Sequence, residues 1–312
     1  MNAIEVDQIT KSIGDRTILN NVTFKVKKSR IHGFLGPNGA GKTTTMRILC
    51  GLTQPSSGEV FFEGIPLSKY DNKLYHKIGF LIEDPPLYSD MRVDDYLKYV
   101  ARLRSVNEND LKKQLDYCLD SLDLHEVKSR SIENLSRGFK QRVGIAQAII
   151  HMPDIVFLDE PSLGLDPRSV AEIRTLISNL KENHTVILSS HLLHEMSLVC
   201  DDISIISKGR ILESGPLENL RSSLEASSSF VLSAIEENKH FEDYLHAEPN
   251  ISKFSIIDQG SYIDYHITLS VNEEIRPEVI KQAVNAEMDI LGLEKKAFSL
   301  EEYFLRVTEN HD

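Results

Sequence analysis

The chain has 312 residues, of which 41% are hydrophobic and 26% charged, a composition typical of a folded globular protein and unlike that of a disordered one. This length exceeds what one small hydrophobic core usually organises, so we expect two domains. The formal net charge of −12 argues against a protein that binds duplex DNA through a basic face.

The N-terminal residues MNAIEVDQITKSIG are polar and acidic, whereas a secretion signal would be basic and then apolar. No run of about 18 apolar residues occurs in the sequence. We therefore expect a cytoplasmic protein without a segment that spans a bilayer.

The first part of the chain alternates between strand and turn patterns. IEVDQIT and TILNNVTFKV alternate apolar and polar residues, which predicts strands. An apolar strand at 31–35 then leads into a glycine-rich turn and a helix from about Lys42, after which GEVFFEGIPL resumes the strand pattern. Helical periodicity dominates residues 85–150, which predicts a helical subdomain.

Two short apolar runs, at 155–158 and 186–188, are each followed by polar residues. This pattern is typical of parallel strands that are buried on both faces. A helix expected at 168–181 lies between them and makes a βαβ crossover. A hairpin turned by Lys208-Gly209 then closes the first domain.

The small, polar stretch SSLEASSS at 222–229 is interpreted as a linker or a weakly tied helix end. Beyond it, strand and helix patterns follow in the order βαββαβ, with a further helix over 300–307, which predicts a small ferredoxin-like module. We therefore expect an α/β fold with a phosphate-loop domain at 1–222, including a helical subdomain and an antiparallel β edge, and a C-terminal α+β accessory domain at 223–312.

The glycine-rich turn carries the strongest functional signal. GPNGAGKT fits the phosphate-loop pattern G-x-x-x-x-G-K-[ST], with a strand before it and a helix after it. Glycines let successive backbone N–H groups point at phosphate oxygens, and the helix adds its positive end. A turn that only connects strand and helix is the alternative, and the correct flanks argue against it. The expected nucleotide ligands are Gly36, Pro37, Asn38, Gly39, Ala40, Gly41, Lys42, Thr43 and Thr44.

Lys42 of the phosphate loop and three polar residues at strand ends, Asp159, Glu160 and His191, make up the predicted reaction chemistry. Lys42 can reach the β- and γ-phosphates, and Asp159, at the end of an apolar strand, can hold Mg²⁺. Glu160, one residue further, can orient and deprotonate the attacking water. His191 leaves the next buried strand beside the expected γ-phosphate. We therefore predict Glu160, His191 and Lys42 as catalytic residues.

A second anion-binding element is expected at the start of a helix. LSRGFKQR precedes an amphipathic helix, which Ser136 can cap. The positive end of the helix and the Gly138 N–H would then be free to bind an anion. An ordinary capped helix would be the preferred interpretation if this segment stood alone.

The three cysteines are widely separated and no CxxC pair or His/Cys cluster accompanies them. We interpret Cys50, Cys118 and Cys200 as free thiols in a reducing compartment and expect no cysteine metal site.

Taken in order, these elements resemble the ABC transporter ATPase family across roughly residues 4–220. GPNGAGKTT is similar to the Walker A motif, LSRGFKQRV to the signature, IVFLDEP to Walker B and SLGLD to the D-loop, and His191 falls on the switch histidine. The resemblance implies ATP and Mg²⁺ as ligands. It also implies a head-to-tail dimer, in which the phosphate loop of one subunit faces Ser136 and Gly138 of the other across MgATP.

Four positions depart from the usual family pattern. Ile13 stands where an aromatic residue normally stacks on adenine, and Glu83 replaces the Q-loop glutamine. Arg137 and Phe139 stand in the signature where Gly and Gln are commoner. Such variation, and the C-terminal SLEEYFL, resemble the ATPases of ABC-2-type exporters, including multidrug, sodium-efflux and gliding-motility relatives.

The glutamate in the Q-loop position changes the expected metal site. Glu83 is similar to the E-loop of lantibiotic-immunity exporters and, near Mg²⁺, can accept water or metal contacts. The expected metal ligands are therefore Thr43, Asp159 and Glu83.

The resemblance implies an ATP-hydrolysing subunit that energises export through a separate polytopic membrane permease, peripheral on the cytoplasmic face of the inner or plasma membrane. Its partner ATPase would be a second copy or a paralogue, and no nucleic acid is expected. The main alternative is a soluble ABC ATPase of translation or repair. Translation types usually carry two cassettes in one chain, whereas this chain carries one. Repair types separate their motifs with long coiled coils, for which 312 residues and these motif spacings leave no room. An inactive regulatory module is the third reading, against which Lys42, Asp159, Glu160 and His191 argue. The cargo stays open.

Overall fold

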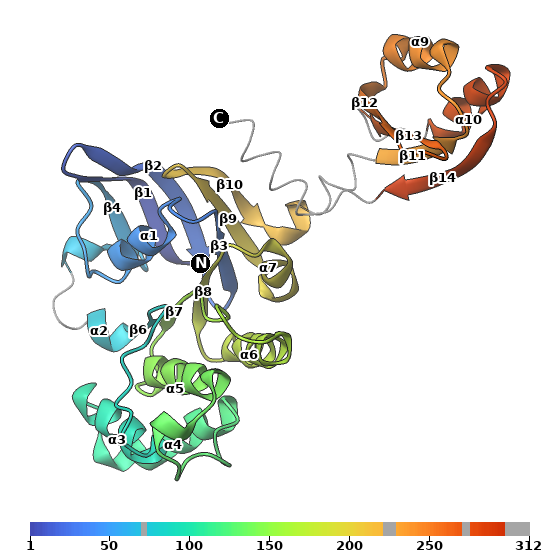
Figure 1. The fold of residues 1–312 in the computed structure, drawn as a ribbon. Coiled ribbons are helices and arrows are strands. Elements are labelled where there is room, and N and C mark those ends of the chain that lie inside the picture. Colours follow the sequence, from blue (N-terminus) through green and yellow to red (C-terminus); the bar gives the residue numbers. More distant parts are fainter. Residues whose placement is uncertain (70–73, 221–228, 270–274, 297–312) are drawn as a thin grey trace. The chain divides into compact units, whose positions relative to one another are not determined.

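The computed structural model describes residues 1–69, 74–220, 229–269 and 275–296, shown in Figure 1. Contacts divide the chain into two units, Met1–Leu217 and Glu218–Asp312. The predicted helix at 300–307 and nearly all of the predicted linker lie outside the described residues. Within the described ranges, no helix is both long enough and apolar enough to cross a membrane.

The N-terminal sheet of the first unit is antiparallel, in the order β2-β1-β4-β5. Its strands are β1 (Asn2–Ile13), β2 (Arg16–Lys27), β4 (Ser57–Phe62) and β5 (Ile65–Pro66). Alternate residues of β2, among them Val22, Phe24 and Val26, are buried in one core, so the alternating pattern correctly predicted these strands.

The second sheet is six-stranded, in the order β10-β9-β3-β8-β7-β6, and only its β9–β10 pair is antiparallel. Its strands are β3 (Ile31–Leu35), β6 (Ile78–Leu81), β7 (Ile155–Asp159), β8 (Thr185–Ser190), β9 (Asp202–Ser207) and β10 (Arg210–Pro216). Every residue of β3, β7 and β8 is buried, which confirms the prediction of central parallel strands. We did not predict β6, because its four residues carry no period that separates a strand from a helix.

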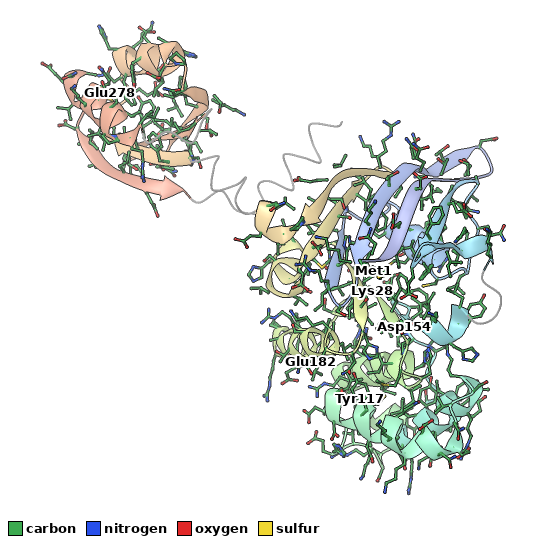
Figure 2. All side chains as sticks on the ribbon, turned by 180° about the vertical axis from the view of Figure 1, so that it is seen from behind. Met1, Lys28, Tyr117, Asp154, Glu182 and Glu278 are labelled. Carbon is green, nitrogen blue, oxygen red and sulfur yellow. The ribbon has the colours of Figure 1, made fainter. Side chains whose placement is uncertain are left out.

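The helices of the first unit lie in two groups. Beside the strands are α1 (Lys42–Leu49), α2 (Leu74–Lys77), α6 (Pro167–Leu180) and α7 (Leu193–Val199). Away from β1 and β2 gather α3 (Val93–Leu103), α4 (Glu108–Ser121) and α5 (Arg137–Ile149), as Figure 1 shows, with a 3-10 turn at Ile132–Asn134. A second 3-10 turn, Leu67–Lys69, follows β5 and contacts β4. Tyr117 of α4, labelled in Figure 2, hydrogen-bonds His184 just before β8 (3.1 Å) and so ties this helical group to the sheet.

The second unit has the predicted order βαββαβ. Its elements are β11 (Ser229–Ala234), α9 (Lys239–Ala247), β12 (Ile251–Asp258), β13 (Ile263–Leu269), α10 (Arg276–Asn285) and β14 (Ile290–Lys296). The sheet is antiparallel in the order β12-β13-β11-β14. Phe230, Leu232, Tyr265 and Ile267 of the central strands pack with Phe241 of α9 in a separate core.

A buried histidine on β3 makes the stability of the first unit depend on pH. His32 is 1% exposed, its Nε2 lies 2.9 Å from Ser204 Oγ, and its Nδ1 has no partner. Burial lowers the pKa of His32 to about 4, against the opposing effect of Asp202. Because the folded pKa lies below the unfolded one, the stability contribution is complete above about pH 6.5 and is lost as the pH falls towards 4.

We therefore expect the free energy of unfolding to fall by about 3 kcal/mol between pH 6.5 and pH 4 on account of His32. Urea denaturation across this range should show a shallower pH dependence in His32→Gln, whereas the exposed His194→Gln should behave as wild type. An unchanged slope in His32→Gln would contradict the assignment.

Candidate functional site

Three neighbouring strands end at the same edge of the six-stranded sheet. Leu35 of β3 pairs with Ser190 of β8, and Ser189 of β8 pairs with Asp159 of β7. The glycine-rich loop follows β3, Glu160 follows β7 and His191 follows β8. The register therefore brings the predicted phosphate loop, carboxylates and histidine to one place.

The phosphate loop folds around its own lysine. Lys42 is 6% exposed, and its Nζ donates to Gly36 O (2.8 Å) and Pro37 O (3.4 Å). The backbone is tight, because a β-carbon on Gly36 would lie 2.4 Å from Ile206 O, and Gly41 has a φ of 110°. Only glycine fits such positions without strain.

The first N–H groups of α1 are open to an anion. No side chain caps this helix at Gly41, and its first turn contains no acidic residue. Orphan N–H groups and the helix dipole together favour a phosphate at this end. The loop and the helix therefore fit a nucleotide phosphate.

Glu160 is held between the lysine and the histidine. Its Oε1 lies 3.1 Å from Lys42 Nζ, and its Oε2 accepts from His191 Nδ1 at 2.9 Å. Glu160 is 8% exposed and has a φ of 47°, an unusual conformation for a residue with a side chain. Such backbone conformations concentrate at functional sites, and this one lies between the two predicted catalytic partners.

Ser189 connects the two carboxylates, a role we did not predict. The serine is fully buried; its Oγ donates to Asp159 Oδ1 (2.6 Å) and accepts from Glu160 N (3.0 Å). The signal in the sequence was the run of polar residues that ends a buried strand.

We expect Ser189→Ala to lower the free energy of unfolding by about 1–3 kcal/mol, because it leaves a buried carboxylate oxygen and a backbone N–H without this partner. Urea denaturation measures the loss. Ser178→Ala, which removes only a local bond to Arg174 O in α6, should cost much less. Equal losses in the two variants would contradict the bridging role.

The predicted metal ligands all lie at or after the carboxyl ends of strands in the six-stranded sheet, but they differ in burial. Asp159 is buried, Thr43 is half-buried at the start of α1, and Glu83 is exposed in the segment after β6. Leu81 of β6 pairs with Leu158 of β7, so the Glu83 segment departs beside Asp159. Within the described residues no group of three or more His, Cys, Asp or Glu side chains forms a metal site by itself. The role of Glu83 stays a prediction.

The first turn of α5 forms a second anion-binding element. Ser136 caps the helix by accepting from Phe139 N (3.4 Å), as we predicted, and no acidic residue follows in the first turn. Ser136 and Gly138 line a cavity of about 680 Å³ between α5 and α6, together with Asp166 and Ser169. In the described part of the chain these two residues make no contact with the phosphate loop.

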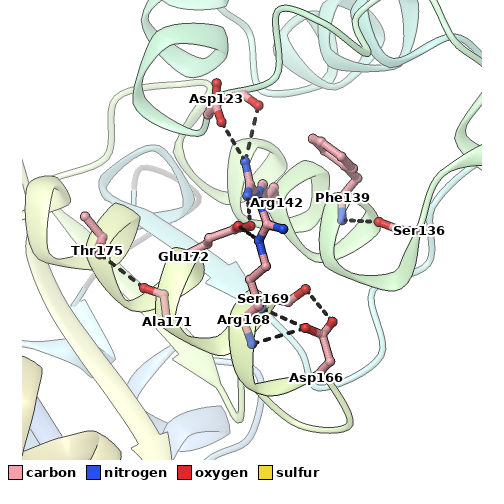
Figure 3. A network of polar contacts seen from close by, with 10 residues as sticks. All are labelled: Asp123, Ser136, Phe139, Arg142, Asp166, Arg168, Ser169, Ala171, Glu172 and Thr175. Carbon is pink, nitrogen blue, oxygen red and sulfur yellow. Dashed lines mark hydrogen bonds and ion pairs between the residues drawn. The ribbon is translucent and has the colours of Figure 1, made fainter.

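Arg142 anchors α5 beside this cavity, as Figure 3 shows. The residue is 6% exposed, and its guanidinium pairs with Glu172 of α6 (2.6 Å) and Asp123 (3.1 Å). It also lies 4.9 Å from the centre of the Phe139 ring. The arginine therefore fixes the signature helix against α6 and the turn after α4.

Ile13 is the last residue of β1 and is 62% exposed. An aliphatic side chain there cannot stack on a base as an aromatic ring does, and such stacking contributes on the order of 1–3 kcal/mol in nucleic-acid binders. We expect Ile13→Tyr to raise ATP affinity or the preference for ATP over GTP. Titration of both nucleotides into wild type and variant measures this, and identical affinities would refute it.

The sequence is similar to known ABC transporter proteins over the region that contains these motifs. Residues 19–163 match the family model described as ABC transporter. The chain is 32% identical to the bacitracin transport ATP-binding protein BcrA of Bacillus licheniformis, over 97% of this chain and 96% of that protein. It is 39% identical to the lantibiotic transport ATP-binding protein SrtF of Streptococcus pyogenes, over 67% of this chain and 89% of that protein.

A solved structure supports the same assignment. The dimeric structure of MJ0796, a bacterial ABC transporter cassette, superposes with a TM-score of 0.61 at 25% identity and covers 69% of this chain and 98% of the cassette. The likeness to BcrA, in contrast, spans nearly the whole chain and includes the second unit.

Proposed function

The chain belongs to the ABC transporter family as an ATP-binding, ATP-hydrolysing subunit, and we propose that two copies, or this chain and a paralogue, enclose ATP between them and drive export through a separate membrane permease. The observation that carries the proposal is Glu160, fixed between Lys42 and His191 where the phosphate loop meets the carboxyl ends of β7 and β8. A soluble, transport-free ATPase is not favoured, because the named relatives are transport subunits.

The Lys42–Glu160 pair gives the site a step that depends on ATP. Both side chains are buried, so the ion pair has lost most of its water. A triphosphate that binds the loop attracts Lys42 more strongly than one carboxylate does. Glu160 is then released to accept a proton from the attacking water, with His191 holding its second oxygen.

Bound Mg²⁺ would supply positive charge against the negative charge that develops on the phosphate oxygens. We propose that the Thr43 hydroxyl and the Asp159 carboxylate hold the ion, with Glu83 nearby. Ser189 supports this arrangement, because its bond to one Asp159 oxygen fixes the carboxylate.

The second half of each ATP site comes from the other subunit. Ser136 caps the N-terminus of α5 and Gly138 lies in its first turn. Among the described residues, neither forms a hydrogen bond to the phosphate loop of its own chain. A head-to-tail dimer would place them against the γ-phosphate of the ATP that the partner holds. The MJ0796 cassette, which has the same fold, is dimeric.

We place the permease contact near α2 and α3, which puts the subunit at the cytoplasmic face of the membrane. Several large apolar side chains are exposed here: Leu52, Tyr75 and Ile82 line one pocket, and the rings of Tyr88 and Tyr99 lie 5.6 Å apart. Exposed patches of this kind mark protein contacts. Arg104, half-buried beside them, donates to Tyr75 O and offers a cation to the same partner.

Affinity capture tests the transport assignment. A tagged Glu160→Gln chain with ATP should retain a polytopic membrane protein from detergent-solubilised source membranes, and Lys42→Ala with ATP should retain much less of it. Recovery of ribosomes or repair proteins, or of the chain alone, would overturn the permease partner and leave the ATP chemistry intact.

A further inference from the structure

Arg137 opens α5 at a signature position where the family usually has glycine. Its side chain is exposed, and its guanidinium lies against Gly164, in the loop that follows Glu160. A β-carbon built on Gly164 would lie 2.6 Å from Cζ and Nη2 of Arg137 and 2.7 Å from Nη1. Because these three distances are nearly equal, the flat face of the guanidinium covers the glycine.

Gly164 lies in a short hydrogen-bonded loop that connects Glu160 to α6. The glycine has a φ of 71°, and the loop is closed by bonds from Leu163 N to Glu160 O (3.1 Å) and from Leu165 N to Ser162 O (3.2 Å). The loop ends at Asp166, which caps α6. Arg137 therefore joins the first turn of α5 to a loop that is itself bonded to Glu160.

Two further contacts hold the starts of α5 and α6 together. A β-carbon on Gly138 would lie 3.0 Å from Ser169 Oγ, and Arg142 pairs with Glu172 as seen in Figure 3. These contacts hold α5 and α6 together. A shift of the first turn of α5 therefore moves the loop that contains Gly164, because packed contacts do not deform continuously.

We propose that Arg137 is a positioning residue that links the two ATP sites of the dimer. This rests on the nucleotide sandwich proposed above, in which Ser136 and Gly138 bind the ATP held by the partner, whereas Glu160 acts on the ATP of its own subunit. Through its contact with Gly164, Arg137 makes the position of Glu160 depend on whether the ATP held by the partner is bound. Glycine at this position would leave the loop without that contact.

Steady-state ATP hydrolysis against ATP concentration tests this role. Arg137→Ala should lower kcat by about tenfold and bring the Hill coefficient towards 1, while ATP affinity of the single chain and the melting temperature stay as in wild type. Lys113→Ala is the matched control, since it removes a positive charge from an exposed position of α4. Wild-type kinetics in Arg137→Ala, or an equal loss in Lys113→Ala, would overturn the proposal.

A double-mutant cycle isolates the contact itself. The methyl group of Gly164→Ala would displace the guanidinium, so this variant should lose cooperativity as Arg137→Ala does, and the double variant should be no worse. Melting temperatures in both backgrounds measure the strain of alanine at positive φ. Additive losses of kcat would show that the two residues act separately and would refute the link.

The kinetics of wild type distinguish a failure of the nucleotide sandwich from a failure of the Arg137 link. If wild type hydrolyses ATP without cooperativity, the nucleotide sandwich fails and Arg137 has no sites to link. If wild type is cooperative and Arg137→Ala equals it, only the role of Arg137 fails.

Discussion

Glu160→Gln should lower kcat for ATP hydrolysis by roughly 10²–10⁴-fold, the range associated with loss of a general base. Glutamine keeps the size of the side chain and can still hydrogen-bond His191, but it cannot take a proton from water. The substitution also removes the buried ion pair with Lys42, in which Lys42 Nζ lies 3.1 Å from Glu160 Oε1. We therefore expect ATP to bind more tightly to the variant, because the triphosphate no longer competes with a carboxylate for the lysine.

Phosphate release and equilibrium ATP binding measure the two effects separately. Glu182→Gln is the matched control, since it removes the charge of an exposed glutamate in the turn after α6. Turnover within tenfold of wild type in Glu160→Gln would refute its role as the base. Unchanged or weaker ATP binding would refute the competition for Lys42.

Lys42→Ala should weaken ATP binding by about 10- to 100-fold and abolish measurable hydrolysis. Hydrogen bonds to charged groups contribute about 1.5–3 kcal/mol, and every 1.4 kcal/mol changes an affinity tenfold. The variant also leaves Glu160 buried without its cation, although His191 remains as a partner. Loss of the lysine therefore affects binding and the position of the base together.

Titration of ATP into Lys42→Ala and Arg47→Ala checks this expectation. Arg47 lies on the same helix, is exposed and carries the same charge. Arg47→Ala should bind ATP as wild type does. Wild-type affinity in Lys42→Ala would contradict the assignment of the phosphate loop.

The sequence predicted most of the sheet edge because its signals are local. The strand at 31–35, the buried run before Asp159 and the start of α1 at Lys42 each depend on residues close together in the chain, and all three agree with the structure. The hairpin at Lys208-Gly209 followed from turn chemistry in the same way, since both residues have positive φ.

The contacts that the sequence did not reveal join distant residues. Ser189 meets Asp159 only because β8 lies beside β7, and a serine at a strand end has many other possible roles. Arg137 contacts Gly164 only because the N-terminus of α5 lies next to the loop that leads into α6. The positive φ of Glu160 has no signature in the sequence, because a glutamate has no preference for it.

Light scattering of the Glu160→Gln chain with and without MgATP tests the nucleotide sandwich, because it measures the mass of the particle in solution. We expect 35.3 kDa without nucleotide and twice that mass with ATP, and a return to the single-chain mass when Ser136→Arg is added to block the second half of the site. A chain that binds ATP and keeps the single-chain mass at every protein concentration would contradict a nucleotide sandwich of two copies.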